Sequence, residues 1–224
     1  PAAARCAEAY YRRAHDLFTL SPVPFFLVVG DNDWTDCPNV HTGWNRFTRY
    51  FSRFDKRHWN HNLPVQEPTG NNLAKELRTN FYFVNKGTLF IGLNLVGGNV
   101  HNAAEWTSRL NKEWEWTRDL LWEHSRIMQP SIKAAIVFGH AFPTGNHVRF
   151  FQPFANFLRY KLPDLDVLYM HGDLHQYQVQ HSYMNVPKLT RISLARSGWR
   201  QHPPMLIHVD PDREQGKSPF VFDR

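Results

Sequence analysis

Apolar and polar residues in the first thirty positions follow two different spacings. From Ala3 to Phe18 apolar residues recur every three or four positions, beginning with Cys6 and Tyr10, which predicts an amphipathic helix. The proline-containing stretch 21–24 ends that pattern. Phe25 to Val29 follows as a short continuous apolar run, typical of a strand buried on both faces. A helix leading into a buried strand predicts α/β layering.

The middle of the chain predicts a hairpin after a long irregular stretch. Residues 39–80 are polar, with helical spacing only around Trp44 to Phe54 and Leu73 to Arg78, so we expect an insertion over one edge of a sheet. Phe81 to Val84 and Thr88 to Leu95 are strand candidates. The Asn-Lys-Gly between them supplies the backbone freedom that a tight turn needs.

The second half of the chain alternates helical and strand-like patterns. Ala103 to Arg126 carries Trp and Leu at helical spacing, which predicts the longest helix, with its tryptophans in the core. Ala134 to Phe138 and Asp166 to Met170 are predicted buried strands, separated by a helix from about Pro153 to Tyr160. Three short runs in the tail predict a second, mainly antiparallel sheet packed on the first. These runs are Gln176 to Gln180, Leu189 to Leu194 and Met205 to Val209.

Length and composition fit one globular domain over residues 1–224. The 224 residues are 42% hydrophobic, enough to bury a full core. The net charge of +6 comes from basic residues that are scattered along the chain, which favours a solvated basic surface and does not point to a nucleic-acid partner. No apolar run is long enough to span a bilayer.

The two cysteines, Cys6 and Cys37, fit neither a disulfide framework nor a thiolate zinc site. Cys37 follows Asp36 with no basic residue beside it in sequence. We therefore expect Cys37 to be a buried, unreactive thiol and not a disulfide partner or nucleophile. Two cysteines do not identify the redox compartment of the protein.

Three of the predicted buried strands end in ligand-type residues. The first is followed by Gly-Asp-Asn, the second by Gly-His and the third by His-Gly-Asp-Leu-His. Ligands of open α/β sheets bind at the carboxyl ends of the strands, so parallel strands would bring these side chains together. Nitrogen and oxygen ligands without thiolate suit zinc, iron or manganese. The expected metal ligands are Asp31, Asn32, His140, Asp173 and His175.

These strings resemble the calcineurin-like metallophosphoesterases. Gly30 to Cys37 reads Gly-Asp-Asn-Asp-Trp-Thr-Asp-Cys, similar to the Gly-Asp-Asn-Glu-Trp-Thr-Asp-Cys string of one branch, and Asn94 to Asn99 and the two histidine-bearing strings follow in order. The resemblance implies an α/β sandwich of two mixed β-sheets flanked by helices, here lacking its first strands. It also implies hydrolysis of phosphate esters at a site of two metal ions (Mn, Fe or Zn).

The resemblance can be carried over position by position. Asp31 stands where many relatives have a metal-binding Asn, and Asp173 takes the place of the first His of a Gly-His-x-His motif. His140 and His175 match the family directly. The same branch of the family has Asp at the positions of Asp31 and Asp173, so the resemblance still implies metal binding.

The resemblance also implies residues that act on the phosphate-ester substrate. Asn32 stands where relatives have a His that assists the leaving group. The resemblance therefore does not identify the general acid. Asn32 and His171 are the candidates for catalysis. Trp34 and His171 are the candidates for substrate binding.

Two motifs of the family do not occur ahead of Gly30. The family opens with Asp-x-His and Gly-Asp-x-x-Asp, which supply the bridging carboxylate and most ligands of one metal. We therefore expect this chain to be an incomplete part of a catalytic domain, to hold at most one metal ion and to be inactive alone. A preceding segment or another chain is expected to cover the sheet edge. The alternative is a non-catalytic relative that binds a partner.

Overall fold

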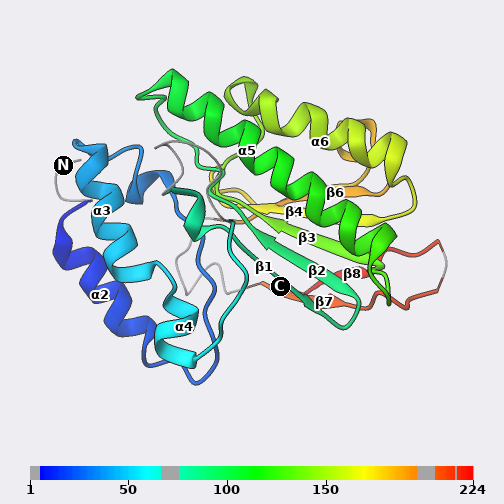
Figure 1. The fold of residues 1–224 in the computed structure, drawn as a ribbon, viewed down its shortest axis with the longest axis horizontal. Helices are drawn as coiled ribbons and strands as arrows, with labels where there is room; N and C mark the ends of the chain where they lie inside the picture. The colour runs from blue at the N-terminus through cyan, green and yellow to red at the C-terminus, as the bar shows by residue number, and fades with distance from the viewer. Residues whose placement is uncertain (1–5, 67–75, 196–204, 215, 224) are drawn as a thin grey trace.

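A six-stranded mixed sheet forms the centre of the molecule (Figure 1). The computed structural model describes residues 6–66, 76–195, 205–214 and 216–223. The strand order is β1-β2-β3-β4-β6-β5, with β2, β3, β4 and β6 parallel and the edge strands β1 and β5 antiparallel. The strands are β1 (Phe81–Asn85), β2 (Thr88–Gly92), β3 (Ala134–Phe138), β4 (Asp166–His171), β5 (Gln178–Gln180) and β6 (Leu189–Ser193).

The predicted hairpin is confirmed as β1 and β2. Asn85 pairs with Thr88, so the turn contains only Lys86 and Gly87. Both have positive φ, 47° and 74°, as a two-residue turn that matches the strand twist requires. β2 ends at Gly92, earlier than the predicted Leu95.

Two long helices cover one face of the sheet (Figure 1). α5 (Ala103–Trp122) and α6 (Val148–Lys161) confirm the predicted helices, and α6 begins five residues before the predicted start at Pro153. Asn102 caps α5, since its side-chain oxygen accepts from the backbone N–H of residues 104 and 105. None of the described helices has both the length and the apolarity needed to cross a membrane.

A small second sheet packs on the opposite face. β7 (Leu206–Val209) and β8 (Phe220–Asp223) pair antiparallel, and Phe220 joins Ile136 and Leu168 in a separate core cluster. The prediction for the tail is wrong in part, because two of its three runs extend the main sheet as β5 and β6. All five residues of β6 are buried, which suits an inner parallel strand and not a one-sided antiparallel one.

Three helices lie beside the sheet at its β1 side (Figure 1). They are α2 (Glu8–Phe18), α3 (Val40–Phe51) and α4 (Phe54–Trp59). The predicted helix from Trp44 to Phe54 is therefore two helices, because Ser52 is extended and Arg53 is left-handed at φ 53°. Of the predicted helix from Leu73 to Arg78, residues 73–75 lie outside the described residues, and the rest forms a short 3-10 turn, Glu76–Thr79.

The predicted strand from Phe25 to Val29 is wrong. No described strand pairs with this segment, and only Val29 in it is buried. Phe26 instead packs its ring against Phe81 and Phe83 of β1. An apolar run becomes a strand only where a partner takes up its N–H and C=O groups.

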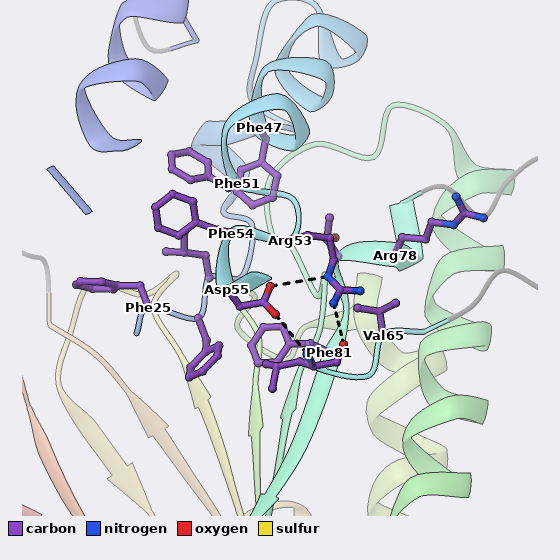
Figure 2. A pocket seen from close by; sticks show the side chains of 13 residues that line it. Phe25, Phe47, Phe51, Arg53, Phe54, Asp55, Val65, Arg78 and Phe81 are labelled. Atoms are coloured by element: carbon purple, nitrogen blue, oxygen red, sulfur yellow. Dashed lines mark hydrogen bonds and ion pairs between the residues drawn. The ribbon is translucent and has the colours of Figure 1, made fainter. Parts of the chain in front are cut away.

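A small cavity separates this segment from α3 and α4 (Figure 2). Phenylalanines line it, including Phe47, Phe51 and Phe54. Asp55 forms an ion pair with Arg53 there, with 3.8 Å between Oδ1 and Nε. Its volume of about 30 Å³ leaves room for no more than a few water molecules. The cavity is therefore a packing gap and not a ligand site.

The prediction of a free thiol at Cys37 is also wrong. Cys37 forms a disulfide with Cys6, with a Cα–Cα distance of 5.7 Å. Both residues are buried. Folding α2 back against the loop after Gly30 brings together two cysteines 31 positions apart, a proximity that local sequence does not reveal.

Candidate metal centre

The carboxyl ends of β3 and β4 lie side by side, as predicted. Phe138 is in register with Met170. The loops that follow are joined, since the N–H groups of Gly172 and Asp173 both donate to the carbonyl of His140, at 3.2 and 3.1 Å. These backbone bonds place His140 and Asp173 at the same edge of the sheet.

Asp31 reaches this edge from a 3-10 turn, Asp31–Asp33, without a strand before it. Its Oδ1 atom lies 2.9 Å from Nε2 of His140. Ligand atoms of Asp31, His140 and Asp173 all lie within 4.8 Å of one another. One imidazole and two carboxylates form a donor set that zinc, iron and manganese accept. These three residues are called the Asp31–His140–Asp173 cluster below.

Charge holds the cluster together. Burial alone raises the pKa of Asp31, but the hydrogen bond and charge of His140 outweigh it and leave the pKa below its ordinary value. Burial likewise lowers the pKa of His140, but the hydrogen bond and charge of Asp31 outweigh it and leave that pKa raised. The two side chains therefore favour an ion pair between an ionised Asp31 and a protonated His140.

Two glycines after β2 allow this close packing. A Cβ atom on Gly97 would lie 2.7 Å from Oδ2 of Asp173. A Cβ atom on Gly98 would lie 2.5 Å from Oδ1 of Asp36 and 2.7 Å from Oγ1 of Thr35, and Gly98 has φ +75°. The backbone of this loop therefore fits against the cluster only without side chains.

Gly98→Ala is expected to lower the free energy of unfolding by about 2–3 kcal/mol, because it combines a strained φ with a clash. Gly145→Ala is the matched control, since a Cβ atom there meets nothing within 4 Å. It should change stability by less than about 0.5 kcal/mol. Urea unfolding of both variants measures the difference, and equal effects would contradict the packing described.

The other expected metal ligands lie around the cluster. Asn32 touches it, since its side-chain nitrogen donates to Oδ1 of Asp31 at 3.1 Å. His175 is exposed, in a left-handed conformation at φ 54°. Its charge helps to lower the pKa of Asp31, so it lies near the cluster without joining the group of three.

The two expected substrate contacts are buried. Trp34 is 7% exposed and packs against Trp44, with ring centroids 4.4 Å apart. His171, at the end of β4, is 1% exposed, and Nη1 of Arg191 lies 3.1 Å from its Nε2. Burial, followed by the charge of Arg191, lowers the pKa of His171 to about 3. A neutral His171 accepts from Arg191, so its proton is on Nδ1, and the role open to it at neutral pH is donation of a hydrogen bond.

The free energy of unfolding is expected to fall below about pH 6.5. The unfolded His171 titrates at its ordinary pKa of 6.5, whereas the folded one titrates at about 3. Between these values the unfolded chain binds more protons, so acid favours unfolding, by about 2 kcal/mol at pH 5 relative to neutral pH. Urea unfolding of the wild type and of His171→Gln at pH 7 and pH 5 tests this. Between pH 7 and pH 5 the free energy of unfolding should fall less in His171→Gln than in the wild type. An equal loss in both proteins would exclude His171 as the cause.

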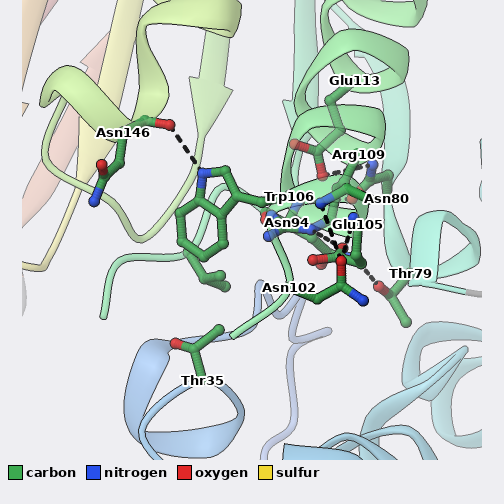
Figure 3. A network of polar contacts seen from close by, with 12 residues as sticks. Thr35, Thr79, Asn80, Asn94, Asn102, Glu105, Trp106, Arg109, Glu113 and Asn146 are labelled. Carbon is green, nitrogen blue, oxygen red and sulfur yellow. Dashed lines mark hydrogen bonds and ion pairs between the residues drawn. The ribbon is translucent and has the colours of Figure 1, made fainter. Parts of the chain in front are cut away.

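A buried polar network supports the loop after β2 and was not predicted (Figure 3). Arg109 of α5 donates to the carbonyl of Asn94 at 2.7 Å and to Glu105 at 2.6 Å. Asn80 donates to Glu113 at 3.4 Å and accepts from the N–H of Asn94 at 2.7 Å. Burial raises the pKa of Glu113 to about 7. The network ties the end of β2 to α5.

The sequence did contain a signal for this network. Arg109 and Glu113 stand three and seven positions after Trp106, so they fall on the apolar stripe of α5 and not between its members. Arg109 is 3% exposed and Glu113 is fully buried. Charged residues on a buried stripe are paired or neutralised, so this position of Arg109 and Glu113 indicates a buried polar network.

Comparison with family models, with curated proteins and with solved structures finds no match to this chain.

Proposed function

We propose that this chain carries part of the catalytic site of a calcineurin-like, metal-dependent phosphoesterase. The observation that carries the proposal is the Asp31–His140–Asp173 cluster at the carboxyl edge of two parallel strands. The α/β sheet with a small second sheet and flanking helices is consistent with it.

The chemistry of the proposed reaction needs more than this cluster. In two-metal hydrolases a pair of metal ions polarises the phosphoryl group and activates a water molecule. The described residues supply three close ligands, with Asn32 in contact and His175 nearby. Such a set holds one metal ion. The bridging carboxylate and the second set of ligands belong to the two motifs that are not found ahead of Gly30.

The alternative is a structural or partner-binding relative without metal. Asp31 and His140 pair with each other without a cation, and this observation favours the alternative. Metal binding therefore separates the two functions.

The test is calorimetric titration of the purified chain with Mn²⁺ and Zn²⁺. One ion per chain is expected, with binding at least about tenfold weaker in His140→Ala and Asp173→Asn, because each removes a direct ligand. His208→Ala, on the exposed strand β7, is the matched control and should bind as the wild type does. A wild type that binds no metal would favour the structural relative.

Hydrolysis of a chromogenic phosphate ester in the presence of these metals tests the catalytic part. The chain alone is expected to show no turnover, since a single ion cannot clamp both the attacking and leaving oxygens. A form extended ahead of Pro1 by a segment with Asp-x-His and Gly-Asp-x-x-Asp should be active, and His140→Ala in that form should abolish the activity. Equal turnover by both forms would refute the proposal that this chain holds an incomplete site.

A further inference from the structure

A larger cavity, of about 430 Å³, opens next to the Asp31–His140–Asp173 cluster. Its walls come from the loop after Asp31, the start of α3 and the first turn of α5. Its volume lies within the range of small-molecule sites. The lining combines three tryptophans, Trp34, Trp44 and Trp106, with a polar rim that includes His41, Asn99 and His101.

Other groups cover most of the faces of the tryptophans, which leaves mainly ring edges for the cavity. The guanidinium of Arg109 lies over both Trp34 and Trp106, at 4.9 and 4.8 Å from the ring centroids, and Trp44 packs against Trp34. The three indoles are only 5–9% exposed, so their faces are largely covered. The edge of an aromatic ring is electropositive and attracts the electron-rich face of another ring. The wall therefore suits a flat aromatic group.

The rim suits neutral polar atoms and not a phosphate. None of the described residues that line the cavity is Lys or Arg. Among the described lining residues, Glu105 alone has a carboxylate, and it already accepts from Arg109. The Nε2 atom of His101 already bonds the carbonyl of Thr35, and Asn99 donates to Asp36 at 3.5 Å. His41 and the remaining polar atoms of these two side chains are the hydrogen-bonding groups that the rim offers. Such a rim recognises the nitrogen and oxygen atoms of a heteroaromatic ring.

The cavity and the cluster share a wall. Thr35 lines the cavity and donates to the carbonyl of Gly97 at 2.9 Å, while the other side of Gly97 faces Asp173. Gly98 fits between Thr35 and Asp31. Figure 3 shows Trp106 above Thr35, and both line the cavity. One thickness of backbone thus separates the cavity from the cluster.

We propose that this cavity binds a planar heteroaromatic ring, as in a nucleoside. Binding of the ring does not depend on the proposed function.

The experiment is calorimetric titration of the chain, without added metal, with adenosine and with ribose 5-phosphate. Adenosine should bind saturably with a Kd below about 1 mM, and ribose 5-phosphate should not bind. His41→Trp and Asn99→Trp place a large side chain at exposed rim positions and should weaken adenosine binding by at least about tenfold. His208→Trp, exposed on β7, is the control and should leave binding unchanged.

Three results would overturn the proposal: no binding of adenosine, binding that both rim variants leave intact, or cavity-dependent binding of ribose 5-phosphate in place of adenosine. His140→Ala separates this proposal from the metal centre. That variant should no longer bind metal but should still bind adenosine. A loss of adenosine binding would mean that the ring does not bind in this cavity.

Discussion

Arg109→Met is expected to lower the free energy of unfolding by about 3–5 kcal/mol, because removing one partner of a buried charged network leaves the others unpaired. Arg109 donates to Glu105 and to the carbonyl of Asn94, and it lies between Trp34 and Trp106. Methionine fills part of the volume but replaces none of these hydrogen bonds. Urea unfolding measures the loss.

Two further variants show whether the network is the cause. Arg118→Met, on the same helix, removes a guanidinium that is 43% exposed and paired with Asp119, so it should cost less than about 1 kcal/mol. Glu113→Gln removes the buried carboxyl group, whose pKa burial raises to about 7. Combined with Arg109→Met, it should cost less than the sum of the single variants. A loss within about 1 kcal/mol for Arg109→Met would show that the network contributes little to stability.

The Cys6–Cys37 disulfide is expected to contribute about 3–4 kcal/mol to the free energy of unfolding, since it closes a loop of 31 residues in the unfolded chain. It also fixes α2 against the loop that carries Asp31, where the Tyr11 hydroxyl donates to the carbonyl of Asp33 at 2.9 Å. Urea unfolding with and without a reducing agent measures this contribution.

The matched control is the double variant Cys6→Ser and Cys37→Ser. It should unfold at the denaturant concentration of the reduced wild type and should not respond to the reducing agent. Thiol titration of the unfolded, unreduced protein gives an independent check. The finding of two free thiols there would contradict the disulfide.

Variants that strongly destabilise the protein cannot test the proposed functions. A protein that loses several kcal/mol can lose metal or ligand binding by unfolding, so Arg109 and the cysteines are unsuitable probes of the site. The exposed positions His41, Asn99 and His208 are better suited, because changes there leave the core intact.

Local patterns in the sequence determined the elements whose partners are close in the chain. Helical spacing from Ala103 onward predicted α5, and a two-residue turn between apolar runs predicted the β1–β2 hairpin. The apolar runs before His140 and His171 predicted two inner strands, and their carboxyl ends do meet. Each of these features depends on hydrogen bonds within an element or on burial between two covered faces.

Contacts between distant segments were decided only by the tertiary structure. Phe25 to Val29 has the composition of a strand, but no described strand pairs with it. Cys37 has the surroundings of a free thiol, but α2 brings Cys6 against it. Asp31 joins the cluster from a turn. Partners just ahead of β1 (Asn80) and just after β2 (Asn94) accommodate Arg109 and Glu113 on a buried stripe. Pairing of this kind depends on which surfaces meet in space, and the periodicity of a single segment contains no information about its partner.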